Sequence, residues 1–156
     1  MSKAASPVPR SYTSTLPYEA ARVYAAAVYC SDGRIGDHVD DFLHHGLGLP
    51  RYDRVACPGG PVALSGRFQA FWDARGAEEQ LRFLAQVHDV RTVVLIAHAN
   101  CAYYLKRLSI PPGGLEAEQR EDLQKATATV QRLMPAADVK RYLAQLTEAE
   151  IRFDAA

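Results

Sequence analysis

Three side chains that could bind a metal ion follow two short apolar runs of the sequence. Cys30 comes directly after the run at residues 23–29, while His98 and Cys101 follow the run at 92–97. Two thiolates and an imidazole are a plausible set of three protein ligands for zinc, and they leave the fourth tetrahedral position free for water. A bound zinc makes such a water acidic enough to supply hydroxide near neutral pH. The sequence therefore predicts a catalytic zinc site.

A carboxylate and a guanidinium follow the first of these cysteines at alternate positions. In an extended chain residues two apart face the same way, so Asp32 can lie beside the metal with Arg34 behind it. A carboxylate there either accepts a hydrogen bond from metal-bound hydroxide or becomes the fourth ligand, and a bidentate arginine would keep it ionised and aimed. Taken alone, the pattern fits an ordinary surface turn with a solvated arginine better than a catalytic pair.

These residues need a fold that brings two distant segments together, and the apolar pattern predicts one. Strand-like runs alternate with helical patterns, the strands at 22–29, 52–57 and 91–97 and the helices at 36–46, 67–88 and 115–134, with a further helix expected after Cys101. This alternation predicts an α/β fold with a mainly parallel sheet flanked by helices. In such sheets ligands bind outside the carboxyl ends of the strands, which is where both motifs begin.

The two ends of the sequence are less regular. Residues 1–21 are rich in proline, serine and threonine and are predicted to form a loose N-terminal arm, ahead of a single domain at 22–156. At the other end residues 139–144 alternate in polarity, which favours a strand, and a turn at 147–150 would lead into a second one. A helix over 138–150 fits the leucines almost as well.

Composition limits the function classes. With 18 basic and 18 acidic residues among 156, no basic excess indicates nucleic acid and no polybasic block indicates anionic lipid. The N-terminus lacks the apolar core of a signal peptide and no apolar run reaches membrane-spanning length, so we expect a cytoplasmic protein. Three cysteines in such a chain favour metal ligation over a disulfide framework, which leaves Cys57 as a small buried hydrophobe.

The two cysteine motifs together resemble the paired signatures of a known enzyme family. Cys-Ser-Asp-Gly-Arg at 30–34 and His-Ala-Asn-Cys at 98–101 are similar to the Cys-x-Asp-x-Arg and His-x-x-Cys signatures of the β-class carbonic anhydrases. The resemblance covers residues 22–105 well and the remainder loosely. It implies an α/β fold on a mainly parallel sheet, assembled as a homodimer or higher homo-oligomer.

The resemblance also implies a role for each motif residue. Carried over one by one, Cys30, His98 and Cys101 match the zinc ligands of the family, and Asp32 and Arg34 match its catalytic pair. The implied reaction is the reversible hydration of CO2 to bicarbonate by zinc-bound hydroxide.

Departures from the family pattern leave other functions open. The family usually has glycine after the last cysteine, often twice, whereas Ala102, Tyr103 and Tyr104 follow it here. The two tyrosine rings could narrow or close the pocket, or pack in the core. The segment at 57–60 replaces an Asn-Ala-Gly-like segment that usually lines the site. The alternatives are a hydrolase of a CO2-like molecule such as COS or CS2 on the same zinc site, and a non-catalytic binding or regulatory relative. Four further histidines are candidate proton shuttles by pKa alone, namely His38, His44, His45 and His88.

Overall fold

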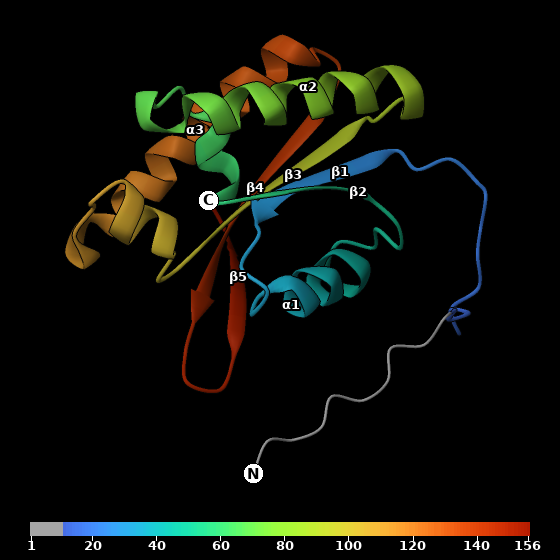
Figure 1. The fold of residues 1–156 in the computed structure, drawn as a ribbon, viewed down its shortest axis with the longest axis horizontal. Coiled ribbons are helices and arrows are strands. Elements are labelled where there is room, and N and C mark those ends of the chain that lie inside the picture. The colour runs from blue at the N-terminus through green and yellow to red at the C-terminus, as the bar shows by residue number, and fades with distance from the viewer. Residues whose placement is uncertain (1–10) are drawn as a thin grey trace.

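Apolar runs from the middle of the chain form the central strands of one sheet. The structure is a computed structural model that describes residues 11–156 (Figure 1). β1 (Ala25–Cys30) and β3 (Thr92–His98) are buried along almost their whole length, which explains why neither alternates in polarity. β2 (Asp53–Cys57) lies outside β1, and β4 (Asp138–Leu146) and β5 (Ile151–Ala155) lie beyond β3, giving the order β2-β1-β3-β4-β5.

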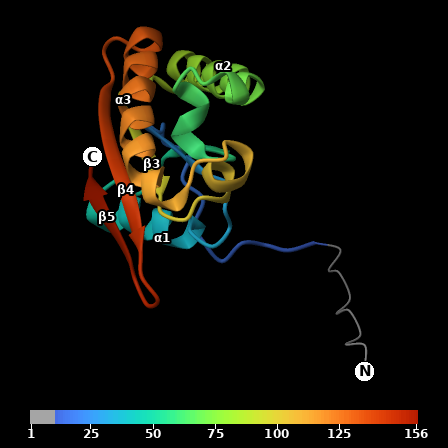
Figure 2. The ribbon, with the colours of Figure 1, turned by 90° about the vertical axis from the view of Figure 1, so that its left-hand side faces the viewer.

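The register of the sheet aligns the carboxyl ends of its parallel strands. β1 pairs with β2 and β3 in parallel, and β3 pairs with β4 in parallel, so that Cys30 faces Cys57 across one pair and His98 faces Ala144 across another. β5 turns back antiparallel to β4, and the two form a long hairpin at the side of the molecule (Figure 2). The expected α/β fold with a mainly parallel sheet is confirmed, and the alternative helix over 138–150 is wrong.

Helices cover both faces of the sheet. α2 (Phe71–His88) and α3 (Leu115–Leu133) lie on one face, and α1 (Gly36–Asp41) lies on the other (Figure 1). α1 continues into a wider π-helical turn at Phe42–Gly46, in line with the helix predicted for 36–46. The side chains that α2 and α3 bury against the sheet follow helical spacing, and they are Ala77, Leu81, Leu123, Ala126 and Val130.

Three elements differ most from those predicted. β1 begins at Ala25 rather than at residue 22. α2 begins at Phe71 after a 3₁₀ turn and runs through Gly76 without a break. The helix expected after Cys101 is a single π-helical turn at Tyr103–Arg107. Two consecutive prolines follow at 111–112, and neither residue can donate the backbone hydrogen bond that a longer helix would need.

Residues 11–24 form no helix or strand, and the first part of this segment extends away from the domain (Figure 1). Arg51 attaches the end of this segment to the domain, because its guanidinium donates hydrogen bonds to the carbonyl oxygens of Glu19 and Ala21 at 3.0 and 2.8 Å. The first part of the predicted arm, residues 1–10, lies outside the described residues.

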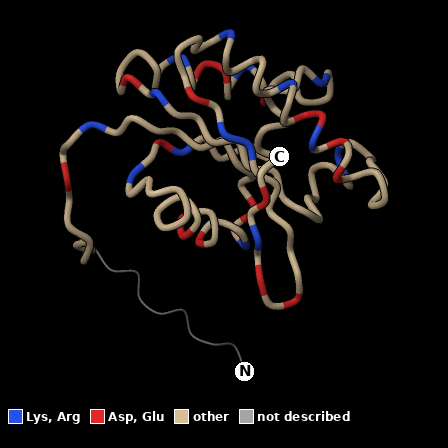
Figure 3. The backbone as a smooth tube through the Cα atoms, turned by 180° about the vertical axis from the view of Figure 1, so that it is seen from behind, with Lys and Arg blue, Asp and Glu red and all other residues tan. Residues whose placement is uncertain are grey.

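Charged residues of both signs are interspersed over the chain rather than gathered by sign (Figure 3). Among residues 11–156, no helix is both long enough and apolar enough to cross a membrane.

Candidate metal centre

Cys30, His98 and Cys101 meet at the carboxyl edge of the sheet. Cys30 ends β1 and His98 ends β3, while Cys101 follows across a turn in which Asn100 has a positive φ of 55°. All three are buried, and their ligand atoms lie within 4.8 Å of one another. The two sulfurs are 4.0 Å apart. A tetrahedral zinc with bonds of about 2.3 Å separates two sulfurs by about 3.8 Å, so the cluster fits one such ion.

The imidazole of His98 has one ring nitrogen occupied and one free. Nδ1 lies 2.8 Å from the carbonyl oxygen of Ala99, and because a carbonyl can only accept, the ring proton lies on Nδ1. Nε2 is then an acceptor, and within residues 11–156 it is the one buried side-chain nitrogen or oxygen that has no hydrogen-bond partner. Such an orphaned atom is costly in a folded protein, and a metal ion would satisfy it.

Backbone amides surround both sulfurs. The N–H groups of Asp32 and Gly59 donate to Cys30, and those of Tyr103 and Tyr104 donate to Cys101. The hydrogen bond from Cys101 is the largest cause that lowers the pKa of Cys30, and the Cys30 sulfur in turn raises the pKa of Cys101. The contact between the two sulfurs therefore favours the thiolate form at Cys30 and the thiol form at Cys101. A bound dication would favour the thiolate form of both.

Arg34 forms a bidentate ion pair with the carboxylate of Asp32 beside the cluster. Its Nε lies 3.0 Å from Oδ1, its Nη2 lies 2.6 Å from Oδ2, and its backbone N–H donates to Oδ1 at 3.0 Å. These hydrogen bonds keep the pKa of Asp32 well below the usual range of a carboxyl group. The side chain of Asp32 is 17% exposed and that of Arg34 is 77% exposed, so the carboxylate is the inner member of the pair.

The turn after β2 approaches the cluster closely because it contains two glycines. Gly59 and Gly60 have φ values of 76° and 58°, which side-chain-bearing residues rarely adopt. A Cβ on Gly60 would lie 2.7 Å from the backbone nitrogen of Cys30, and one on Gly59 would lie 2.8 Å from Cδ1 of Tyr103. The resemblance predicted that this segment lines the site. In the sequence, two glycines directly after a strand are the feature that indicates a close approach of this turn to β1.

The two tyrosines after the cluster have different environments. Tyr104 is buried in the core, where its hydroxyl donates to Asp122 at 2.9 Å. Asp122 is fully buried and also accepts two hydrogen bonds from Nε of Arg67, at 2.9 and 2.8 Å. The ring of Tyr104 therefore packs in the core rather than closing the pocket.

Tyr103 lines the pocket beside the cluster. Its hydroxyl donates to Asp73 at 3.0 Å, and burial together with this carboxylate raises the pKa of the tyrosine. The pocket holds about 390 Å³, and its lining residues include Cys30, Asp32, Gly59, Tyr103, Lys106 and Arg107. Solvent and small molecules can therefore reach one of the predicted ligands and the predicted carboxylate.

Gln119 is a buried polar residue that sequence reasoning missed. Its side-chain amide donates to the carbonyl oxygen of His98 at 2.8 Å, from the second turn of α3. Gln119 stands four residues after Leu115 and four before Leu123, so a polar residue on the apolar face of the predicted helix was the available signal.

The remaining candidates lie outside the cluster. Cys57 is half-buried, with its sulfur 3.5 Å from the carbonyl oxygen of Gly60, and it is not a member of the potential ligand group. His45 pairs with Asp41 at 2.9 Å and His88 pairs with Asp53 at 2.7 Å. The four candidate shuttle histidines, including His38 and His44, are absent from the residues that line the pocket.

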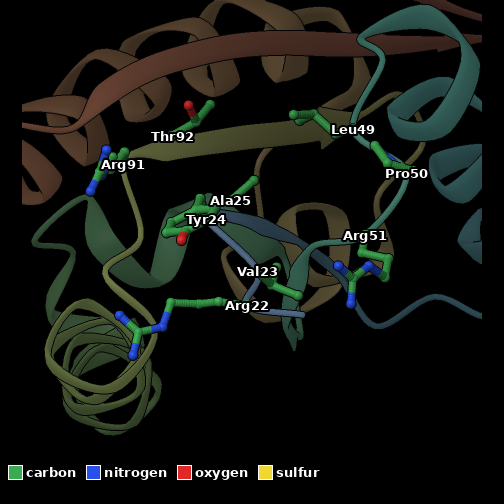
Figure 4. A pocket seen from close by; sticks show the side chains of 9 residues that line it. All are labelled: Arg22, Val23, Tyr24, Ala25, Leu49, Pro50, Arg51, Arg91 and Thr92. Atoms are coloured by element: carbon green, nitrogen blue, oxygen red, sulfur yellow. The ribbon is translucent and has the colours of Figure 1, made fainter. Parts of the chain in front are cut away.

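A second pocket, of about 460 Å³, lies at the opposite edge of the sheet, where β1 and β3 begin (Figure 4). Three arginines border it, and Figure 4 shows the guanidinium groups of Arg22 and Arg91 on one side and that of Arg51 on the other. Arg51 is bound to Glu19 and Arg91 to Asp89. These guanidinium groups do not converge on one point, so the pocket has no assembled polar centre comparable to the cysteine–histidine cluster.

Comparison with known sequences gives one family and two relatives. A family model described as "Putative carbonic anhydrase" matches residues 20–150. An uncharacterized protein of Rickettsia bellii is 28% identical over 122 residues, which cover 74% of this chain and 73% of the relative. An uncharacterized protein of Rickettsia conorii is 25% identical over 123 residues, covering 74% of this chain and 64% of the relative, so the chain spans less than two thirds of that protein.

Comparison with solved structures shows what the fold is similar to. The β-carbonic anhydrase isoform I of Trichomonas vaginalis superposes with a TM-score of 0.56 at 13% identity, covering 92% of this chain and 88% of that one. A carbonic anhydrase from Glaciozyma antarctica gives a TM-score of 0.52 at 17% identity, covering 83% and 80% of the two chains. The α/β fold is thus similar to that of β-carbonic anhydrases.

Proposed function

The chain is a divergent member of the family described as "Putative carbonic anhydrase", and from this premise we propose that it is a zinc-dependent lyase that hydrates CO2 reversibly to bicarbonate and a proton. The observation that carries the proposal is the buried cluster of Cys30, His98 and Cys101, in which Nε2 of the histidine has no partner. Thiolate and imidazole donors favour zinc over hard cations such as magnesium or calcium.

The cluster leaves room for a reaction. Three protein ligands would occupy three of the four positions that zinc prefers, and the neighbouring pocket, which Cys30 and Asp32 line, would give CO2 and water a route to the site. Zinc, when bound, supplies a water acidic enough to act as hydroxide near neutral pH. The backbone N–H groups and the contact with Cys101 lower the pKa of Cys30, which favours the thiolate form that a metal ligand requires. Cys30 and burial raise the pKa of Cys101, so its thiolate form would depend on the metal.

Asp32 and Arg34 are proposed to position the reacting water. Asp32 stays ionised because Arg34 donates to both of its oxygens, so it can only accept a hydrogen bond. That hydrogen bond would orient the water toward CO2. The same hydrogen bonds from Arg34 would keep Asp32 from coordinating the metal at its fourth position.

Assembly as a homodimer or higher homo-oligomer forms part of the proposal. Three aromatic side chains just before and at the start of α2, those of Phe68, Phe71 and Trp72, are 88%, 47% and 80% exposed, and they line one cavity of about 560 Å³. Exposed apolar groups that gather in this way commonly mark a protein–protein contact.

Stopped-flow measurement of CO2 hydration by the zinc-loaded chain tests the proposed reaction. We expect turnover that depends on zinc and is lost after chelation. Fully zinc-loaded protein that hydrates no CO2 would overturn the proposal. Release of H2S from COS or CS2 by that inactive protein would then identify the hydrolase alternative, and inactivity toward all three substrates would identify the non-catalytic one.

A further inference from the structure

A fully buried carboxylate on α3 takes no part in the proposed reaction. Asp122 accepts two hydrogen bonds from Nε of Arg67, at 2.9 and 2.8 Å, and Nη2 of the same arginine contacts Glu118. A buried ion pair gains little stability over well-packed apolar side chains of similar volume. What apolar side chains could not supply is its directional hydrogen bonds, so we expect Asp122 to hold a particular neighbour in place.

That neighbour is Tyr104, which contacts Asp122 with its side chain and the cluster with its backbone. Its hydroxyl donates to Oδ2 of Asp122 at 2.9 Å, and its backbone N–H donates to the sulfur of Cys101. The side chain of Tyr104 is buried, so water does not compete for the hydroxyl. Two hydrogen bonds of one residue therefore connect a carboxylate of α3 to one of the three candidate metal ligands.

The segment after Cys101 needs such a contact from outside. It forms a single π-helical turn at Tyr103–Arg107, and one isolated turn is unstable because it fixes several backbone dihedral angles for few hydrogen bonds. The N–H groups that reach the Cys101 sulfur belong to the first residues of this turn, so their direction depends on what holds the turn. α3, by contrast, is a helix of 19 residues that packs on the sheet, so Asp122 offers the turn a fixed point of attachment.

We infer that Asp122 is a positioning residue, which acts through Tyr104 to hold Cys101 in the place that a metal ligand requires. The inference rests on the proposed function for the identity of the metal, but the contacts that carry it belong to the chain itself. Gln119 lies three residues before Asp122, on the same side of α3, and donates to the carbonyl oxygen of His98. One side of α3 thus contacts His98 directly and Cys101 through Tyr104.

Tyr104→Phe is the variant that tests this connection. It removes the hydroxyl but keeps the buried ring and the ion pair of Asp122, whereas Asp122→Asn would also break that ion pair. The matched control is Tyr52→Phe, because the Tyr52 hydroxyl also donates to a carboxylate, that of Asp40, which is also paired with an arginine, Arg54. Tyr52 lies at the amino end of β2, whereas the cluster lies at the carboxyl edge of the sheet.

Cobalt absorption and zinc release measure the effect on the metal site. In the cobalt-loaded chain, the visible and sulfur-to-metal bands report the geometry of the ligands. The rate of zinc transfer to excess chelator reports how firmly the ligands hold the metal. We expect altered cobalt bands and about tenfold faster zinc release in Tyr104→Phe, because the partners of metal ligands contribute factors of this order to metal affinity. Tyr52→Phe should match the wild type in both measurements.

A third measurement needs no metal. Amide hydrogen exchange in the metal-free protein, followed by NMR, reports how often each part of the chain opens locally. Exchange at residues 102–107 should be faster in Tyr104→Phe than in the wild type, because the turn has lost its attachment to α3. Tyr52→Phe should keep the wild-type exchange rates at these residues.

Wild-type cobalt bands or a wild-type rate of zinc release in Tyr104→Phe would overturn the inference. Equal changes in Tyr52→Phe would also overturn it, because they would indicate a general loss of stability. None of these measurements depends on CO2 hydration, so an inactive protein with the expected metal effects would reject the proposed lyase and support the role of Asp122.

A wild type that binds neither metal would reject the zinc site of the proposed function, and the exchange rates would then decide the inference. Faster exchange at 102–107 in Tyr104→Phe, but not in Tyr52→Phe, would support it. Wild-type exchange at these residues in Tyr104→Phe would overturn it.

Discussion

The side-chain amide of Gln119 donates a hydrogen bond to the carbonyl oxygen of His98 across 2.8 Å, and both residues are buried. The bond connects the second turn of α3 to the last residue of β3. It satisfies a backbone oxygen that water cannot reach. In the proposed function it would also hold the imidazole in the orientation that a metal requires. Gln119 is therefore a positioning residue for His98.

Replacing this amide by an apolar group should destabilise the protein. Gln119→Leu leaves the His98 carbonyl buried without a donor, so we expect the free energy of unfolding to fall by about 1–3 kcal/mol. Urea denaturation of the zinc-loaded protein measures the change. Gln124→Leu is the control, because it lies on the exposed side of the same helix and should cost little. Equal stability of the two variants would show that the His98 carbonyl does not need this partner.

The pair of Asp32 and Arg34 gives a prediction about turnover. Arg34→Ala should release Asp32 to coordinate zinc, and Asp32→Asn should remove the purely accepting partner of the reacting water. Both variants should lower CO2 hydration by about tenfold or more while zinc stays bound. Stopped-flow rates and zinc content measured on the same samples separate these effects.

An ion pair of the same spacing provides the control for that prediction. Arg152 donates to both oxygens of Asp154 at 2.9 Å, two residues away, in β5. Arg152→Ala should leave hydration unchanged, because its partner is remote from the cluster. Wild-type rates in Arg34→Ala and Asp32→Asn would remove this pair from the mechanism.

Cys57 should make stability depend on pH in the alkaline range. Burial, with help from the charges of Asp73 and Cys30, raises the pKa of its thiol from an ordinary 9.0 to about 12. The stabilising contribution of the neutral thiol is complete below the pKa of the unfolded chain and is lost as the pH rises toward the native pKa. Between about pH 7 and pH 10 the wild type should thus lose more free energy of unfolding than Cys57→Ser. Urea denaturation measures the free energy of unfolding of the two proteins at each pH. The same pH dependence in both would show that the pKa of Cys57 is not raised.

The exposed aromatic residues before and in α2 predict self-association. Sedimentation should give a mass above the 17.2 kDa of one chain, and the double variant Phe68→Ser, Trp72→Ser should shift the distribution toward the monomer. Phe83→Ser is the control, since Phe83 is 59% exposed farther along the same helix. A wild type that sediments only as a monomer would contradict the proposed homo-oligomer.

Much of the sheet and the position of the cluster could be predicted from sequence. β1 and β3 are buried on both faces, so their apolar runs had no competing pattern. Parallel strands bring their carboxyl ends to one edge, which is why Cys30 and His98 could be expected together although they lie far apart in the chain.

Details that depend on tertiary packing could not be predicted. Tyr103 and Tyr104 are adjacent residues of the same type, so the sequence does not distinguish them. In the structure Tyr104 lies in the core, where it donates to Asp122, and Asp122 is paired with Arg67. In the sequence Gln119 is only a polar residue on an otherwise apolar helix face. Nothing in the sequence indicates that its amide donates to a carbonyl oxygen of β3. A helix was expected after Cys101, but the chain leaves the helical conformation at Ser109, whose φ is 55°, after a single turn.

Zinc content tests the central claim most directly, because every step of the proposed function depends on a metal held by Cys30, His98 and Cys101. Elemental analysis after expression in zinc-replete medium and dialysis should give close to one zinc per chain for the wild type. Cys57→Ser, which alters the register neighbour of Cys30, should retain that zinc, and Cys30→Ser should lose it. A wild type without zinc, or the same zinc content in all three proteins, would contradict the account.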